Sequence, residues 1–170
     1  METAKYVFFY GHTPNASGLN VFSQWFPVSF VEKLDKNTPI KFANAEQYMM
    51  AHKAMLFGDD YQLKQIMDTP NPLIVKQLGR KIKNFDPVIW DDNKFDIVVQ
   101  GNRLKFSQNP ALMKRLLETK NKTIVEAAPN DKIWGIGLKK EDAVKIPEDQ
   151  WPGQNLLGKV LMVVRNENKN

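Results

Sequence analysis

One stretch of the chain shows the pattern of a capped helix most clearly: Asn44-Ala-Glu-Gln-Tyr-Met-Met-Ala-His-Lys-Ala-Met-Leu-Phe57. Asn44 is a residue type that accepts hydrogen bonds from the free backbone N–H groups of a first helical turn. Gln47 follows three residues later, where the partner in a capping box belongs. Strong helix formers then continue to Gly58, a residue type that commonly ends helices. The stretch therefore predicts a helix with two defined ends.

One face of this helix carries charged and apolar side chains together. Helical spacing places Glu46, Met49, Met50, Lys53 and Phe57 on that face. The axial rise from Glu46 to Lys53 is about 10 Å, and helical side chains lean toward the N-terminus, so Lys53 leans toward Glu46. Two interpretations stay open. The charges either serve the helix dipole and cover the core with a lysine stem, or they form a pair placed for chemistry.

Composition limits the class of protein. The 170 residues are 42% hydrophobic and 25% charged, as in an ordinary globular chain long enough to bury a core. There is no cysteine, and the apolar run Tyr6–Tyr10 is too short to span a membrane, so we expect cytoplasmic or nuclear residence and no membrane partner. His12 and His52 lack the spacing of metal ligands, so we expect neither a metal nor a cofactor.

The net charge of +5 comes from the middle third of the chain. Residues 61–120 carry eleven Lys/Arg against six Asp/Glu, whereas the other segments are nearly balanced. Two basic clusters are expected there: Lys76, Arg80, Lys81 and Lys83, and then Arg103, Lys105, Lys114 and Arg115. Such clusters attract phosphates or nucleic acid, or they simply form a solvated helix face.

The remaining pattern predicts an α+β fold in a single domain over 1–170, predominantly helical with a few short strands. Capping residues and prolines predict helices that begin at Asp59, Thr69-Pro-Asn71, Asp86-Pro87 and Asn109-Pro110, ending near Met67, Gly79, Phe106 and Thr119. Apolar runs predict strands at Tyr6–Tyr10, Val28–Val31, Ile40–Phe42, Thr123–Ala127 and Val160–Arg165, with a turn at 35–39.

Three further stretches offer candidate site residues. Glu126 lies in a strand, Asp131 in the turn beyond it, and Trp134 precedes Gly135, whose small size lets a backbone pass close by. The indole suits either stacking on a nucleobase or packing in the core. Ser23, Gln24 and Trp25 lie in an aromatic cluster that forms either a pocket rim or plain core. Asn155 belongs to a Gly-rich turn that lacks the spacing of known phosphate-binding loops.

Eight blocks of the sequence, in order, resemble the NADAR family, also called YbiA-like. They are Phe9-Tyr-Gly-His-Thr-Pro14, Phe22-Ser-Gln-Trp-Phe-Pro27, Ala45-Glu-Gln-Tyr-Met-Met-Ala-His-Lys-Ala54, Leu78-Gly-Arg80, Lys105-Phe-Ser-Gln-Asn109, Val125-Glu-Ala127, Asp131-x-x-Trp-Gly-x-Gly137 and Asn155-Leu-Leu-Gly158. Together they span nearly the whole chain.

The resemblance implies an enzyme that hydrolyses N-glycosidic bonds. Two substrate classes are associated with the family: ADP-ribose attached to guanine bases of DNA or RNA, and phosphoribosylamino-pyrimidine intermediates of riboflavin synthesis. The family also implies a lysine that forms a Schiff base with the opened sugar, and Lys53 occupies that position. Residues 24–26 read Gln-Trp-Phe where many family members have Asn-Phe-Tyr, which leaves the substrate choice open.

These implications give the candidate residues roles. Glu46 would stabilise positive charge at the anomeric carbon or relay protons, and Lys53, desolvated by its apolar neighbours, would have a lowered pKa. Asp131 is expected to assist catalysis or, like Glu126, to hold ribose hydroxyls, and Trp134 would stack on the base. We expect Ser23, Gln24, Trp25, Gly135 and Asn155 to contact substrate. The alternative is a non-catalytic module that binds ADP-ribose or nucleic acid.

Overall fold

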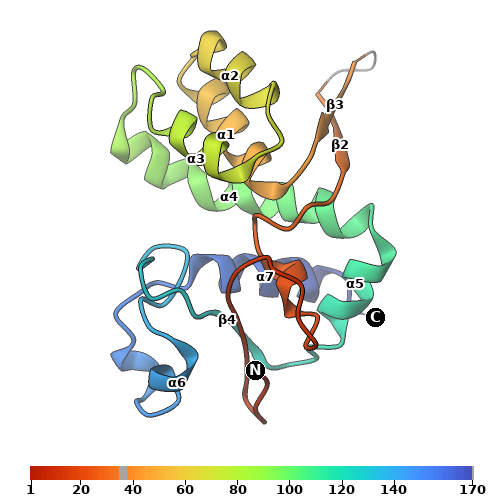
Figure 1. The fold of residues 1–170 in the computed structure, drawn as a ribbon, viewed down its shortest axis with the longest axis vertical. Helices are drawn as coiled ribbons and strands as arrows, with labels where there is room; N and C mark the ends of the chain where they lie inside the picture. Colours follow the sequence, from red (N-terminus) through yellow and green to blue (C-terminus); the bar gives the residue numbers. More distant parts are fainter. Residues whose placement is uncertain (35–37, 170) are drawn as a thin grey trace. The chain divides into compact units, whose positions relative to one another are not determined.

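The computed structural model describes residues 1–34 and 38–169, and contacts within it divide the chain into two compact units. Unit 1 consists of Met1–Ser23 and Pro110–Asn170, and unit 2 consists of Gln24–Asn109 (Figure 1). Unit 1 therefore combines the two ends of the chain, and unit 2 is the continuous segment between them. The expectation of one domain over 1–170 stays a prediction.

Unit 2 is built around helix α1 (Ala45–Leu56), the helix predicted from the first stretch. Three further helices pack against α1, and a short antiparallel hairpin completes the unit (Figure 1). These elements are α2 (Asp60–Met67), α3 (Pro72–Gly79), α4 (Pro87–Ser107), β2 (Phe30–Lys33) and β3 (Pro39–Phe42). Most of the predicted turn at 35–39 lies outside the described residues.

The start of α1 is fixed by a network of amide hydrogen bonds. The side-chain oxygen of Asn44 accepts the Gln47 N–H at 2.8 Å, as the capping pattern predicts. The Gln47 side chain accepts in turn from the Ala43 N–H at 2.8 Å, one residue before the position of a standard capping box. Its amide group also donates to the carbonyls of Ile66 and Thr69, so α1 is anchored to the end of α2.

Aromatic packing fills the core of unit 2. In the hairpin Phe30 pairs with Phe42, and the Phe42 ring lies 5.0 Å from that of Tyr48 on α1. Gly101 allows α4 to approach this ring closely, because a Cβ atom there would lie 2.5 Å from Tyr48 Cδ1. Helices α1 and α4 therefore meet at a glycine.

Unit 1 has two parallel strands covered by a helix. Tyr6 pairs with Thr123, and Phe9 pairs with Glu126, in β1 (Tyr6–Phe9) and β4 (Thr123–Glu126). Helix α7 packs on β4 at Gly158, where a Cβ atom would come within 2.1 Å of the Ile124 carbonyl oxygen. The other elements are η1 (Leu19–Phe22), α5 (Pro110–Leu117), α6 (Lys140–Ala143), η2 (Glu148–Gln150) and α7 (Leu156–Glu167).

The predicted strand Val160–Arg165 is wrong, because this segment lies within α7. Valines and other apolar residues gave the run a strand-like composition. In the structure, its buried positions Leu157, Val160, Leu161 and Val164 recur every three or four residues. That is the period of a helix with one face against β4, so burial overrides the local β propensity.

The predicted α+β class is confirmed, since the described residues are mainly helical with a few short strands. The predicted starts of α2 to α5 agree with the structure within a residue or two. No helix in residues 1–34 and 38–169 is long and apolar enough to cross a membrane.

The two predicted basic clusters have different environments. Lys76, Arg80, Lys81 and Lys83 are all exposed on unit 2. The second cluster is no surface patch, because Lys105 is 0% exposed, with its Nζ 5.7 Å from the centroid of the Phe26 ring. Burial lowers the pKa of Lys105 to about 7.

Candidate active-site residues

Glu46 lies in the first turn of α1 and is 5% exposed. Its backbone N–H donates to the Gln24 carbonyl at 3.0 Å. The side-chain oxygen of Gln24 accepts from the Asn102 amide of α4 at 2.9 Å. Gln24, expected as a substrate contact, therefore holds the start of α1 to α4 and fixes the turn that carries the Glu46 carboxylate.

Lys53 lies about two helical turns after Glu46 on the same face of α1, and groups from two other segments surround its amine. Its Nζ donates to the Gly79 carbonyl at 3.1 Å. The same nitrogen lies 4.6 Å from the centroid of the Phe85 ring and 5.4 Å from that of the Trp90 ring. Both rings present apolar surface with a partial negative face, so they remove water from the amine and still attract its cation. One hydrogen bond and two aromatic rings therefore hold the amine in place.

This environment changes the protonation of Lys53. Burial lowers the pKa of the amine below that of an ordinary lysine. The charge of Glu46 acts in the opposite direction, and the guanidinium of Arg80 adds to the lowering. The direction agrees with the sequence expectation, although the expected walls were Met49, Met50 and Phe57.

Two of those expected neighbours, Phe57 and Met50, support the residues that contact the Lys53 amine. The Phe57 ring packs edge-on against Phe85 at 5.4 Å and supports it. Met50 packs against Gly79, where a Cβ atom would lie 2.0 Å from the Met50 sulfur. The close approach of α3 to α1 at this glycine carries the Gly79 carbonyl to the Lys53 amine.

Sequence reasoning missed Phe85 and Trp90. Phe85 stands just before the helix start at Asp86, and Trp90 lies in the first turn of α4. No spacing links them to α1, because the loop after α3 brings them there. The sequence block Leu78-Gly-Arg80 was the one signal that pointed to this region of the chain. Gly79 accepts a hydrogen bond from the Lys53 amine, and the charge of Arg80 lowers its pKa.

Two expected substrate contacts lie in neighbouring positions of the sequence but in different units. Ser23 ends η1 of unit 1 and is buried, and its backbone N–H donates to the Asn20 carbonyl. Trp25 belongs to unit 2 and is half-buried, with the Lys76 Nζ 6.0 Å from its ring centroid. Lys76 is itself exposed.

The loop after β4 contains three of the predicted residues of unit 1: Asp131, Trp134 and Gly135. Asp131 closes a turn, because its Oδ1 accepts the backbone N–H groups of Ile133 and Trp134, each at 2.9 Å. Trp134 is half-buried. Gly135 returns close to β4, where a Cβ atom would lie 3.0 Å from the Glu126 carbonyl oxygen. The backbone that passes near Gly135 is therefore the chain's own strand.

Asn155 supports the same strand. Its Oδ1 accepts the Glu126 N–H at 3.0 Å, and its Nδ2 donates to the Ile124 carbonyl at 2.9 Å. A neighbouring parallel strand would bond these same two groups, on either side of Val125, with the N–H and C=O of a single residue. The Asn155 side chain thus replaces a strand at the outer edge of β4, which is a structural role where a substrate contact was expected.

The predicted residues form two groups. In unit 2, α1 carries the acid and the amine, and Gln24 is bonded to the turn that holds the acid. In unit 1, Glu126 ends β4 and is bonded to Asn155, and Asp131, Trp134 and Gly135 lie in the loop after β4. Ser23 directly follows η1. In the part of the chain that the structure describes, no three His, Cys, Asp or Glu side chains are grouped for a metal ion.

Comparisons with known proteins show which proteins the chain is similar to. The chain is 63% identical over 169 residues to a protein named N-glycosidase R617 of Acanthamoeba polyphaga mimivirus, and the match covers 99% of each. It is 29% identical over 154 residues to the chloroplastic riboflavin biosynthesis protein PYRR of Zea mays, covering 86% of this chain and 23% of that protein.

The fold also has a solved counterpart. The NMR structure of the E. coli protein YbiA superposes with a TM-score of 0.75 and 24% identity, covering 98% of this chain and 86% of that one. The sequence model of the NADAR domain matches residues 8–168. The chain therefore belongs to the NADAR domain family.

Proposed function

We propose that this chain is an N-glycosidase that removes ADP-ribose from guanine bases of DNA or RNA, with Lys53 as its nucleophile. The observation that carries the proposal is the environment of the Lys53 amine. Burial against Phe85 and Trp90 lowers its pKa, and it shares a helix face with the buried carboxylate of Glu46. An amine that loses its proton at a lower pH than usual is an effective nucleophile. The similarity to a named N-glycosidase supports the reaction class.

The steps follow from this pair. Opening of the ribose breaks the C1′–O4′ bond, places a proton on O4′ and leaves C1′ as an iminium carbon bonded to the base nitrogen. The neutral Lys53 amine attacks C1′. A proton then passes from Nζ through the Glu46 carboxylate to the base nitrogen, and the base departs. The Schiff base between Nζ and C1′ adds water, which releases the sugar as an aldehyde and restores the amine.

The remaining candidates have binding roles in the proposal. Trp134 stacks on the released base, and Glu126 and Asp131 contact ribose hydroxyls or assist a proton transfer. The exposed basic residues of unit 2 contact phosphates.

A second candidate substrate is a phosphoribosylamino-pyrimidine of riboflavin synthesis. The similarity to PYRR of Zea mays favours it. The reaction at C1′ would be the same, because this substrate also carries a flat heterocycle on the anomeric carbon of a phosphorylated ribose.

The test is incubation of the full chain with ADP-ribosylated guanine DNA and, separately, with the riboflavin intermediate, followed by mass spectrometry of the products. Borohydride added during turnover should leave the sugar attached to a peptide that contains Lys53. Lys53→Arg keeps the charge but supplies no neutral amine. This variant should therefore form no borohydride-trapped adduct and should not hydrolyse the substrate. The matched control is Lys64→Arg on α2, an exposed lysine paired with Asp68 at 2.9 Å, which should behave as the parent.

Other results would change the proposal. An active Lys53→Arg without trapping would favour attack by water activated by Glu46. Binding of ADP-ribose without cleavage of either substrate would indicate the non-catalytic module. Turnover should also survive exhaustive chelation, and a strict requirement for a divalent ion would contradict the mechanism.

A further inference from the structure

Unit 1 contains a cavity of about 650 Å³ that includes none of the residues assigned above. Its volume falls within the range of about 300–1,000 Å³ typical of small-molecule sites. The lining comes from the N-terminal segment, the end of β1, the following loop, the exit of β4 and the start of α6: Met1, Phe8, Phe9, Tyr10, Asn15, Ala16, Ser17, Leu19, Asn20, Ala127, Pro129, Lys139, Lys140 and Glu141.

The cavity lies where the two parallel strands end. Phe8 and Phe9 are the last residues of β1, and Tyr10 follows them. Ala127 and Pro129 come directly after β4. Ligands of parallel sheets bind outside the carboxyl ends of the strands, since the chain leaves each strand there in a loop and opens a space between the loops. The same geometry holds for β1 and β4.

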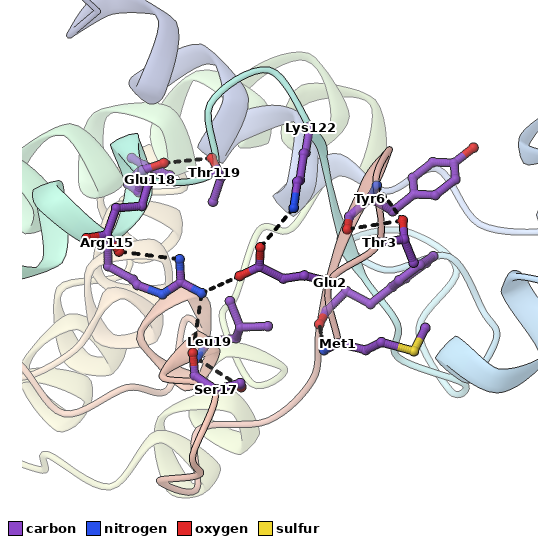
Figure 2. Close-up of polar contacts among 12 residues, drawn as sticks. Met1, Glu2, Thr3, Tyr6, Ser17, Leu19, Arg115, Glu118, Thr119 and Lys122 are labelled. Carbon is purple, nitrogen blue, oxygen red and sulfur yellow. Dashed lines mark hydrogen bonds and ion pairs between the residues drawn. The ribbon is translucent and has the colours of Figure 1, made fainter.

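Ion pairs fix the walls of this space (Figure 2). Arg115 donates one hydrogen bond to the Glu2 carboxylate at 2.5 Å and another to the Ser17 carbonyl at 3.3 Å. Lys122 bonds the other Glu2 oxygen at 3.1 Å. The hydrogen bond from Arg115 lowers the pKa of Glu2, so the pairs persist at neutral pH. Arg115 thereby connects the N-terminal segment to the loop that carries Ser17, both of which line the cavity.

The lining has an aromatic part and a cationic part. Tyr10 lines the cavity and is 62% exposed, so much of its side chain is accessible to a ligand, and Phe8 and Pro129 add apolar lining. Lys139 and Lys140 stand at the start of α6, where Glu141 pairs with Lys140 at 3.8 Å. One net positive charge remains there. Such a lining is complementary to a flat heterocycle that carries phosphate.

We propose that this cavity binds a nucleoside 5′-diphosphate, with the base against Tyr10 and the phosphates at Lys139 and Lys140. Binding at this site requires no reaction at Lys53. It therefore adds a ligand site to the chain whether or not the proposed glycosidase activity holds.

Titration calorimetry on the full chain tests the proposal with ADP, adenosine and inorganic pyrophosphate as separate probes. ADP should bind more tightly than either part. Tyr10→Ala should weaken ADP binding by about tenfold or more, the usual value of one stacked base, and leave pyrophosphate unaffected. The double variant Lys139→Ala/Lys140→Ala should weaken ADP and pyrophosphate alike by about tenfold or more. The matched control is Lys145→Ala, an exposed lysine after α6 that pairs with Asp142 and does not line the cavity; it should bind as the parent.

Each contrary result overturns a defined part of the proposal. Absence of ADP binding to the parent chain overturns it entirely, as does binding that neither the tyrosine nor the double-lysine variant weakens. Pyrophosphate that binds as tightly as ADP overturns the nucleoside part. The glycosidase proposal fails separately, because a chain that binds ADP through these residues but cleaves no N-glycosidic bond leaves the cavity site intact. Melting temperatures of the variants should match that of the parent.

Discussion

The substitution Asn155→Ala separates a structural role from a substrate contact at a residue that sequence alone assigned to substrate. Asn155 is 7% exposed, and its carboxamide accepts the Glu126 N–H at 3.0 Å and donates to the Ile124 carbonyl at 2.9 Å. Alanine removes both bonds and leaves two backbone groups of β4 without these partners.

The size of the effect follows from three terms. Each buried backbone group that loses its partner costs about 1–3 kcal/mol, so the two together cost about 2–6 kcal/mol. Asn155 also has a φ of 54°, in the left-handed region, which asparagine tolerates but which costs alanine about 1–2 kcal/mol. Water that reaches the vacated site recovers part of this. We therefore expect the free energy of unfolding to fall by about 4 kcal/mol.

Urea denaturation followed by tryptophan fluorescence measures this loss. Asn155→Gly is the matched control, because glycine adopts the left-handed conformation freely and loses only the hydrogen bonds. It should be more stable than the alanine variant by about 1 kcal/mol. Unfolding of Asn155→Ala within about 0.5 kcal/mol of the parent, together with a raised KM, would refute the structural role.

Four other results are expected. Glu46→Gln keeps the side-chain shape and deletes the charge, so turnover should fall by about 10²–10⁴ with an unchanged melting curve; activity within a few-fold of the parent would limit Glu46 to a favourable interaction with the helix dipole. Trp134→Ala should weaken calorimetric binding of a base-bearing substrate by about 1–3 kcal/mol and leave ribose phosphate unaffected, whereas equal losses would mark a core residue. Because burial lowers the pKa of Lys53 and only its neutral form attacks, borohydride trapping should rise with pH through a midpoint below about 10.4, and a midpoint at or above that value would contradict the desolvated site. Tyr48→Phe removes the hydroxyl that donates to the buried Glu32 carboxylate at 2.6 Å, so urea denaturation should show a loss of about 1–3 kcal/mol; an unchanged midpoint would mean that this bond adds nothing.

Local signals in the sequence identified the helices well. The Asn44 cap, and the prolines that follow Asn71, Asp86 and Asn109, act through backbone groups within a few residues, so their effect is readable without the fold. The shared face of Glu46 and Lys53 follows from the same local geometry. What a residue contacts along its own helix could therefore be predicted.

Contacts between residues far apart in the sequence could not be predicted. The rings of Phe85 and Trp90 reach Lys53 through a loop whose path no periodicity encodes. The composition of Val160–Arg165 predicts a strand, and only the burial of one helical face on β4 decides otherwise. The edge role of Asn155 likewise depends on where α7 begins relative to β4.

The pairing of β1 with β4 has a consequence for biosynthesis. All of Gln24–Asn109 must leave the ribosome after β1 and before β4, because it lies between them in the sequence. Unit 2 can therefore acquire its structure during translation, as continuous segments generally do. Unit 1 can fold only after nearly all of the chain has been synthesised. Until then Val7, Phe8 and Phe9 form an unpaired apolar strand on the nascent chain. That strand is the segment on which we expect chaperones to act, and on which premature termination would cause aggregation.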